Sequence, residues 1–291
     1  MTDSRATALV TDSTVSLPMG LAEELGIHVV PMHVTMGGQS YRDGIDITAG
    51  ELYRLLRGGA ELPRTSTPDP GNFVAAFEEA ATASPGIVCV VVSRRYSAVL
   101  DAANTAADVF REQRPEIDLR IVDSGTAAGA QAALMVATAR RIEANTSTDE
   151  AEALVNALKD RSYMLAALDT LHYVGKGGHV PRVAAWAGDL LRVKPILEMA
   201  PGGEINRPER PRTRRRAIER LVHLAHEKIG DAPALMNVIH ADALDEAERL
   251  KGRVAAEFQC EEILVTEFSP VIGAHTGPGL LGLAFCIAPR D

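Results

Sequence analysis

The segment Ile87-Val88-Cys89-Val90-Val91-Val92 is an unbroken run of apolar, mostly β-branched residues. Such a run is typical of a strand in a parallel sheet, where helices cover both faces and no side chain meets water. After it, apolar residues recur at helical spacing from Val99 to Phe110, and another strand is predicted at 119–122. Strands that alternate with helices in this way predict a doubly wound parallel sheet.

The same alternation extends toward the start of the chain. A strand is predicted at 8–11, a short helix at 18–25, and one extended segment at 27–36 that ends in the turn Gly37-Gly38. The second half of the chain has more glycine turns, which favour a mixed sheet. Its strands are predicted at 164–168, 195–199, 235–240, 263–268 and 280–287, and a helix from about Pro181 to Arg192. We place the division between two α/β domains at residues 162 and 163.

Length, composition and charge exclude several classes of protein. With 291 residues, 46% hydrophobic and 24% charged, the chain is long enough for a large core without disulfides. A net charge of −9 argues against general binding to nucleic acid, which needs a basic face. The longest apolar run is far too short to span a bilayer. Since the first residues also lack a secretory pattern, we expect a cytoplasmic protein.

One segment departs from this acidic balance. The arginine segment is defined by its clustered basic residues, Arg207, Arg210, Arg212, Arg214, Arg215 and Arg216. It is either a solvated loop that leads into a helix, or a positive patch for an anion, an acidic partner or an anionic membrane surface.

Several familiar sites of chemistry are missing from the sequence. A Gly-x-Gly-x-x-Gly pattern occurs at Gly277–Gly282, but a dinucleotide site needs a following helix, a second strand and an acidic residue, and only nine residues remain. There is no Walker A motif. His223 and His226 share a helical face without a third ligand nearby, so no metal site is expected. We also expect no cofactor.

Hydroxyl side chains cluster where the predicted strands end. They are Ser13, Thr14, Thr65, Ser66, Thr67, Ser93, Ser97 and Ser124. Ligands of doubly wound sheets bind beyond the carboxyl ends of the strands, and hydroxyl groups there can bind a small anion together with helix N-termini. Each hydroxyl alone is more often a helix cap, but together they indicate a binding site.

At this point the sequence resembles the DegV family of bacterial fatty-acid-binding proteins. The matching stretches run in order along almost the whole chain: VTDST at 10–14, IHVVPMHV at 27–34, RTSTPDPGNF at 64–73, VVSRRYSA at 91–98, IVDSGTAAG at 121–129, LHYVGKGGHV at 171–180, KPILEMAPGGEI at 194–205, RTRRRAIERL at 212–221 and IGAHTGPGLLGL at 272–283. The resemblance implies a three-layer α/β/α first domain and a two-layer α/β second domain, with a long-chain fatty acid between them.

The resemblance also implies roles for individual residues. The hydroxyls of Thr65 and Ser97 would bind the fatty acid carboxylate, with Ser66, Ser93, Ser13 and Ser124 as secondary candidates. His275 and Arg212 would lie near the head group or serve its phosphorylation by a partner, a fatty acid kinase. The chain would then be a lipid carrier and no enzyme, presenting a fatty acid such as palmitate or oleate for acyl-phosphate formation and phospholipid synthesis.

Two other functions remain open on the sequence. One is a serine-dependent acyl hydrolase or transferase that uses Ser97 or Ser124 as nucleophile and His275 as base, although no nucleophile elbow is present. The other is a regulatory DNA-binding protein, which the acidic charge and the lack of a helix-turn-helix pattern disfavour.

Overall fold

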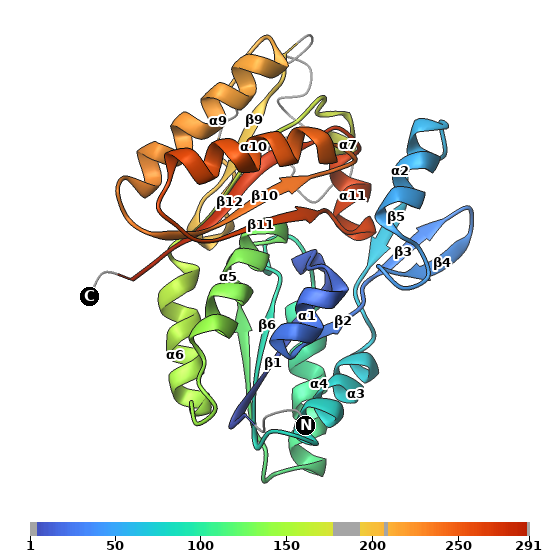
Figure 1. The fold of residues 1–291 in the computed structure, drawn as a ribbon. Helices are drawn as coiled ribbons and strands as arrows, with labels where there is room; N and C mark the ends of the chain where they lie inside the picture. The colour runs from blue at the N-terminus through green and yellow to red at the C-terminus, as the bar shows by residue number, and fades with distance from the viewer. Residues whose placement is uncertain (1–4, 177–192, 207–208, 290–291) are drawn as a thin grey trace.

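The computed structural model describes residues 5–176, 193–206 and 209–289, and the strands in this part of the chain form three sheets (Figure 1). The helix predicted from about Pro181 to Arg192 and the residue Arg207 lie outside the described residues. Within them, no helix is long and apolar enough to cross a membrane.

The first sheet is parallel, as the run at 87–92 predicts. Its strands, in spatial order, are β2 (Ile27–Val30), β1 (Thr7–Asp12), β6 (Gly86–Val91) and β7 (Asp118–Asp123). The helices around it are α1 (Met19–Leu25), α3 (Pro70–Ala81), α4 (Val99–Gln113), α5 (Ala128–Arg141) and α6 (Thr148–Lys159). Ile87, Cys89 and Val91 of β6 pack in a core with α3 and α4, whereas Val88 and Val90 pack with α5. Helices therefore cover both faces, and the three-layer prediction is confirmed.

The second sheet is mixed, again as expected. Its strands, in spatial order, are β11 (Cys260–Glu267), β10 (Ala234–His240), β12 (Leu281–Ile287), β8 (Ser162–Ala167) and β9 (Ile196–Met199). Only the β10–β11 pair is parallel among the strand pairs of this sheet in the described residues. Helices α9 (Arg214–Ile229) and α10 (Leu244–Glu257) cover one face, and α5 lies against the other (Figure 1).

Helix α5 connects the two sheets because it is buried between them. All residues from Ala128 to Ala139 are buried, and most have small side chains that let both sheets approach closely. At Gly129 the approach is closest: an added Cβ would lie 2.4 Å from Cγ2 of Ile239 and 3.1 Å from Cβ of Ala284. The two sheets thus pack on one helix. The division into two domains at residues 162 and 163 stays a prediction.

The extended segment expected at 27–36 consists of two strands that lie in different sheets. Strand β2 ends at Val30, and after Pro31 a separate strand, β3 (His33–Met36), leaves the parallel sheet. Proline has no N–H group for the sheet ladder, which accounts for the break. β3 pairs antiparallel with β4 (Gln39–Arg42) and with β5 (Arg64–Ser66), and its Val34 lies opposite Thr65. This small third sheet is what positions Thr65.

Two short helices complete the surroundings of the site, and neither was predicted. Helix α2 (Ala49–Arg57) begins with a capping box between Thr48 and Glu51. Helix α11 (Pro270–Thr276) carries His275, and its N-cap residue Ser269 makes no side-chain cap.

Asp43 fastens α11 to the first part of the chain. Its side chain is 3% exposed and accepts hydrogen bonds from Ser13 Oγ at 2.6 Å and from the backbone N–H of Val271 at 2.9 Å. Asp43 therefore replaces the missing cap of α11 from a distant loop. Burial raises the pKa of Asp43 to about 6, above its ordinary value of 3.8, although these hydrogen bonds counteract the shift.

Glycine-to-alanine changes test the close packing of α5. The substitution Gly129→Ala pushes a methyl group into Ile239, so we expect the free energy of unfolding to fall by about 1–3 kcal/mol. The matched control is Gly252→Ala in α10, where a Cβ meets nothing within 4 Å; it should raise stability by about 0.5–1 kcal/mol. Denaturant unfolding measures both, and equal effects would contradict the packing described.

The buried carboxyl of Asp43 predicts a specific pH dependence. Because its pKa is raised in the folded state, Asp43 stabilises the fold fully below about pH 4, and this contribution is lost as pH rises through 6. The stability of the wild type relative to Asp43→Asn should therefore fall between these pH values, by up to about 3 kcal/mol for a shift of this size. Denaturant unfolding at a series of pH values measures the difference. Parallel curves for the two proteins would refute the assignment.

Candidate functional site

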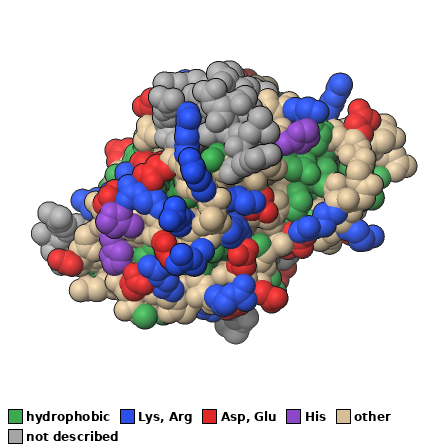
Figure 2. Space-filling model, turned by 90° about the horizontal axis from the view of Figure 1, so that it is seen from above, with side chains coloured by type: hydrophobic (Ala, Val, Ile, Leu, Met, Phe, Trp, Pro, Cys, Tyr) green, Lys and Arg blue, Asp and Glu red, His purple; other side chains and the backbone are tan. Residues whose placement is uncertain are grey.

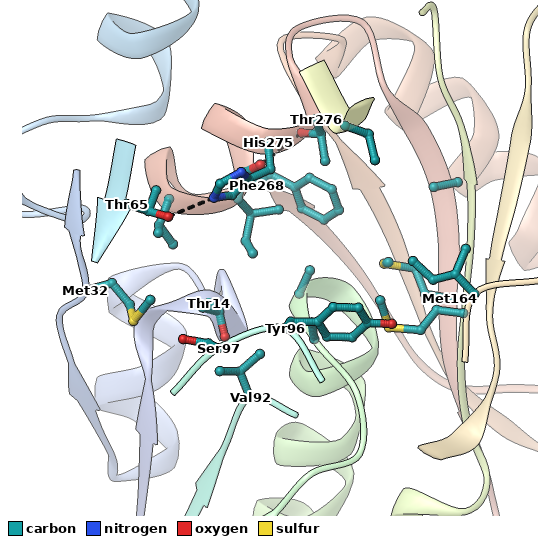
Figure 3. A pocket seen from close by; sticks show the side chains of 18 of the residues that line it. Thr14, Met32, Thr65, Val92, Tyr96, Ser97, Met164, Phe268, His275 and Thr276 are labelled. Atoms are coloured by element: carbon teal, nitrogen blue, oxygen red, sulfur yellow. Dashed lines mark hydrogen bonds between the residues drawn. The ribbon is translucent and has the colours of Figure 1, made fainter. Parts of the chain in front are cut away.

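A largely apolar cavity of about 490 Å³ lies where the two sheets diverge at the start of α5 (Figure 3). Its volume and lining are typical of a site for a small, mostly apolar molecule. Ala127 and Ala128, at the N-terminus of α5, form part of its wall, and the remaining lining comes from both sheets and from α11.

The second sheet supplies most of the apolar wall. Met164 and Ala166 of β8, and Leu168 directly after it, line the cavity, whereas the alternate residues Leu165 and Ala167 pack under α9 and α10. This division follows from the two-residue period of a strand. The other apolar side chains of the cavity include Leu197, Met199, Phe268, Val271 and Leu280.

Hydroxyl groups line the side of the cavity opposite this wall. Thr65 Oγ1 lies 2.8 Å from Nε2 of His275 in a hydrogen bond that joins β5 to α11 (Figure 3). Ser66 and Ser97 also line the cavity, and the hydroxyl of Ser97 has no hydrogen-bonding partner among the described residues. The structure thus brings together Thr65, Ser97 and His275, three residues from distant parts of the sequence.

Two helix N-termini reach the same cavity. Ala98 precedes α4 and Ala127 precedes α5; both line the cavity, and neither alanine can cap its helix with a side chain. The first amide groups of a helix and its dipole favour a negative charge at that end. The cavity therefore combines an apolar wall with a region suited to an anion.

A buried carboxyl lies beneath the hydroxyl side. Thr14 lines the cavity, and its Oγ1 lies 2.5 Å from Oδ1 of Asp12 and 2.8 Å from Oε1 of Gln131. Asp12 is fully buried, and the loss of solvation raises its pKa although Thr14, Val92 and Gln131 donate hydrogen bonds to it. Through its hydrogen bond, this carboxyl holds Thr14 at the edge of the cavity.

The glycines at 277–282 serve a tight turn. Gly277 and Gly279 have φ values of 68° and 90° between α11 and β12, and a Cβ would lie 2.1 Å from the Tyr173 ring at Gly277 and 2.7 Å from Asp169 Oδ2 at Gly279. No helix follows the motif, since β12 begins at Leu281. The motif therefore lacks the strand–turn–helix setting of a dinucleotide site.

Three of the predicted serines lie outside the cavity lining. Ser13 donates its hydroxyl to Asp43, Ser124 donates to the carbonyl of Thr126 at 3.1 Å, and Ser93 accepts from the N–H of Arg95 at 3.3 Å. Serine after a strand often forms such local bonds, which the sequence cannot distinguish from ligand contacts.

Arg212 also lies outside the cavity lining. It is exposed just before α9. Its neighbour Arg214 pairs with Glu246 at 2.8 Å and lies 3.7 Å from Asp169. Asp169 in turn packs against Gly279, so the arginine segment is connected to the turn after His275.

A serine nucleophile is not favoured by this geometry. Ser124 is 1% exposed, bonded to Thr126 and outside the cavity lining. Ser97 shares the cavity with His275, but Nε2 of His275 bonds to Thr65.

In the described residues, no group of three or more His, Cys, Asp or Glu is arranged to hold a metal ion.

A polar groove borders the cavity at the Thr65–His275 pair. It has a volume of about 820 Å³, and both residues line it as well as the cavity. Its other polar side chains include Arg64, His172 and Lys176. The pair therefore stands between an apolar interior and a partly basic surface.

Sequence reasoning missed Tyr96 and Phe268 as cavity residues, whereas Thr14 and Thr67 belong to the expected hydroxyl loops. Tyr96 had a usable signal, because it directly precedes Ser97 in the loop after β6. Its hydroxyl donates a hydrogen bond to the backbone carbonyl of Gly203. Phe268 could not be distinguished from a core residue, since it is fully buried at the end of a strand.

Comparisons with known proteins agree with this fold. A family model described as "Uncharacterised protein, DegV family" matches residues 6–288. The DegV domain-containing protein SCO2569 of Streptomyces coelicolor is 36% identical over 288 residues, which cover 96% of this chain and 98% of that protein. Protein DegV of Bacillus subtilis is 31% identical over 286 residues, with coverage of 96% and 98%.

Solved structures give the same result. A DegV family protein from Thermus thermophilus, described as fatty acid binding, has a TM-score of 0.88 at 28% identity, covering 97% of this chain and 100% of that chain. DegV from Bacillus subtilis, described as a fatty acid binding protein, has a TM-score of 0.85 at 30% identity, covering 98% and 100%. Because the family model and the curated relatives match nearly its whole length, this chain belongs to the DegV family.

Proposed function

We propose that this protein binds a long-chain fatty acid in the cavity, with the carboxylate at Thr65 and Ser97 and the acyl chain against β8 and β9. The observation that carries the proposal is the pairing, in one cavity, of an apolar wall with hydroxyl groups and two helix N-termini. The solved relatives from Thermus thermophilus and Bacillus subtilis, described as fatty acid binding, support the same ligand class.

The energetics fit such a ligand. An ionised carboxylate is costly to bury unless it is well hydrogen-bonded, and the hydroxyls and helix amides supply donors. The acyl chain supplies affinity: some fifteen methylenes at about 0.8 kcal/mol each give on the order of 10 kcal/mol as an upper bound. Binding of this kind needs no metal, cofactor or reaction by the protein itself.

We further propose that the protein is a carrier that presents the carboxyl group to a fatty acid kinase, for acyl-phosphate formation and phospholipid synthesis. The groove supports this step, because it shares Thr65 and His275 with the cavity and so offers a partner access to the carboxylate. His275 would hold the head group in place while charge develops during phosphoryl transfer.

The arginine segment is our candidate for the docking surface, with Arg212 in it. Arg210, Arg212 and Arg216 are exposed and take part in no ion pair within the described residues, whereas Arg214 and Arg215 pair with Glu246 and Glu219. Exposed cations of this kind, on a molecule whose Lys and Arg side chains are otherwise interspersed with Asp and Glu on the face seen from above (Figure 2), suit a partner that is acidic or an anionic membrane surface, where the acyl chain would be exchanged in the cytoplasm.

Substitutions at the hydroxyl groups test the carboxylate site. Thr65→Val and Ser97→Ala each remove one donor to a charged group, worth about 1.5–3 kcal/mol, so palmitate should bind about ten to a hundredfold more weakly. Thr105→Val is the matched control, because Thr105 is exposed on α4 outside the cavity lining. Titration calorimetry measures the Kd. Unchanged affinity in both cavity variants would place the carboxylate elsewhere.

Charge reversal tests the docking surface. Arg210, Arg212 and Arg216 together changed to Glu should weaken binding to phosphatidylglycerol-containing vesicles by about a hundredfold or more, since each cation near an anionic surface contributes about 1 kcal/mol. Palmitate affinity should not change. Arg249→Glu, at an exposed site on α10, is the control. Equal vesicle binding by the triple variant and the control would remove the docking proposal.

A further inference from the structure

The side chain of Tyr96 lines the cavity between the hydroxyl side and the apolar wall. Its aromatic ring extends from the loop after β6, next to Ser97, toward Met164 of the second sheet (Figure 3). With the carboxylate at Ser97 and the acyl chain against β8 and β9, as proposed above, the chain would pass along this ring.

The ring is held at both of its ends. At the backbone end, the N–H of Tyr96 donates to the carbonyl of Ser93 at 2.9 Å, and the N–H of Ser93 donates to the carbonyl of Thr126, also at 2.9 Å. At the other end, the Tyr96 hydroxyl donates to the carbonyl of Gly203. The first anchor belongs to the parallel-sheet side of the cavity and the second to the turn after β9, so the ring spans the gap between them.

The anchor at Gly203 is closely packed. Gly203 has φ 75°, and an added Cβ would lie 3.1 Å from the carbonyl oxygen of Gly125 and 3.3 Å from Ser93 Oγ. The turn after β9 is therefore packed against the loops that follow β6 and β7. Burial raises the pKa of Tyr96 to about 12, so its hydroxyl stays a hydrogen-bond donor at physiological pH.

We propose that Tyr96 is a specificity-determining residue, whose anchored ring forms a rigid wall that favours straight acyl chains over chains with a bend. The inference rests on the proposed fatty-acid function. An aromatic ring held at two points cannot move aside as a flexible aliphatic side chain does, and a close-packed wall rejects a shape that overlaps it. A straight saturated chain would pass along the ring, whereas a chain bent by a cis double bond beside the ring would need space that the ring occupies.

Stearate and oleate provide the direct test, because they have the same length and differ in one cis double bond. In Tyr96→Leu the ring is gone, and the freed space accepts the bend. If the bent chain gains the burial of one or two methylenes, the ratio of the oleate Kd to the stearate Kd should fall by about four- to fifteenfold. In Tyr96→Phe the ring remains and only the bond to Gly203 is lost, so the ratio should shift less than in Tyr96→Leu.

Two further variants keep the experiment decisive. Tyr163→Leu makes the same change outside the cavity, where Tyr163 stacks on Phe285 at 5.5 Å between ring centroids, and should leave the ratio unchanged. If Tyr96→Leu does not fold, as thermal unfolding would show, Tyr96→Met replaces it with a longer flexible side chain and the same expected direction. If the variant that folds, Tyr96→Leu or Tyr96→Met, has the same ratio of oleate Kd to stearate Kd as the wild type, the inference is overturned. Failure of the wild type to bind either acid would instead refute the proposed function, so the two failures are distinguishable.

Discussion

The structure depends on the burial of α5 between two sheets. A helix in this place must be narrow on every side, and the run of alanines with Gly129 meets that requirement where β10 and β12 come closest. Since both sheets pack on the same helix, they are held together along its length and separate only beyond its first turn. The cavity lies at that point, which is why Ala127 and Ala128 line it.

The two sides of the cavity have different chemistry for the same structural reason. The first side presents loops that follow parallel strands, together with the N-termini of α4 and α5, and so offers hydroxyls and amide groups to an anion. The second presents the face of a mostly antiparallel sheet, whose alternate side chains are apolar. Helix α11 joins them: Asp43 caps it from the first side, and His275 reaches Thr65 from it. An amphipathic ligand with one anionic end matches this division.

Much of this could be predicted from the sequence, and the misses have physical causes. Val88 and Val90 identified β6 as a strand inside the sheet. A strand with helices on both of its faces has no position where a polar side chain would meet water. The approximate place of the site followed from hydroxyls after strands, but Ser13, Ser93 and Ser124 bond locally, and the geometry of those bonds is not encoded in residue type. Thr65 was among these hydroxyls, but its role as a carboxylate ligand and the role of His275 came from the family resemblance. β5 has three residues and α11 seven, too few for a periodic signal. Pro31 did mark the break between β2 and β3 and was overlooked.

We infer that the cavity holds one long-chain fatty acid. The most direct measurement is mass spectrometry of lipid extracted from the purified, denatured protein, compared with the molar amount of protein. We expect about one long-chain fatty acid per chain, and uptake of palmitate or oleate by the delipidated protein. Recovery of no stoichiometric fatty acid, together with no uptake of either added acid, would contradict it.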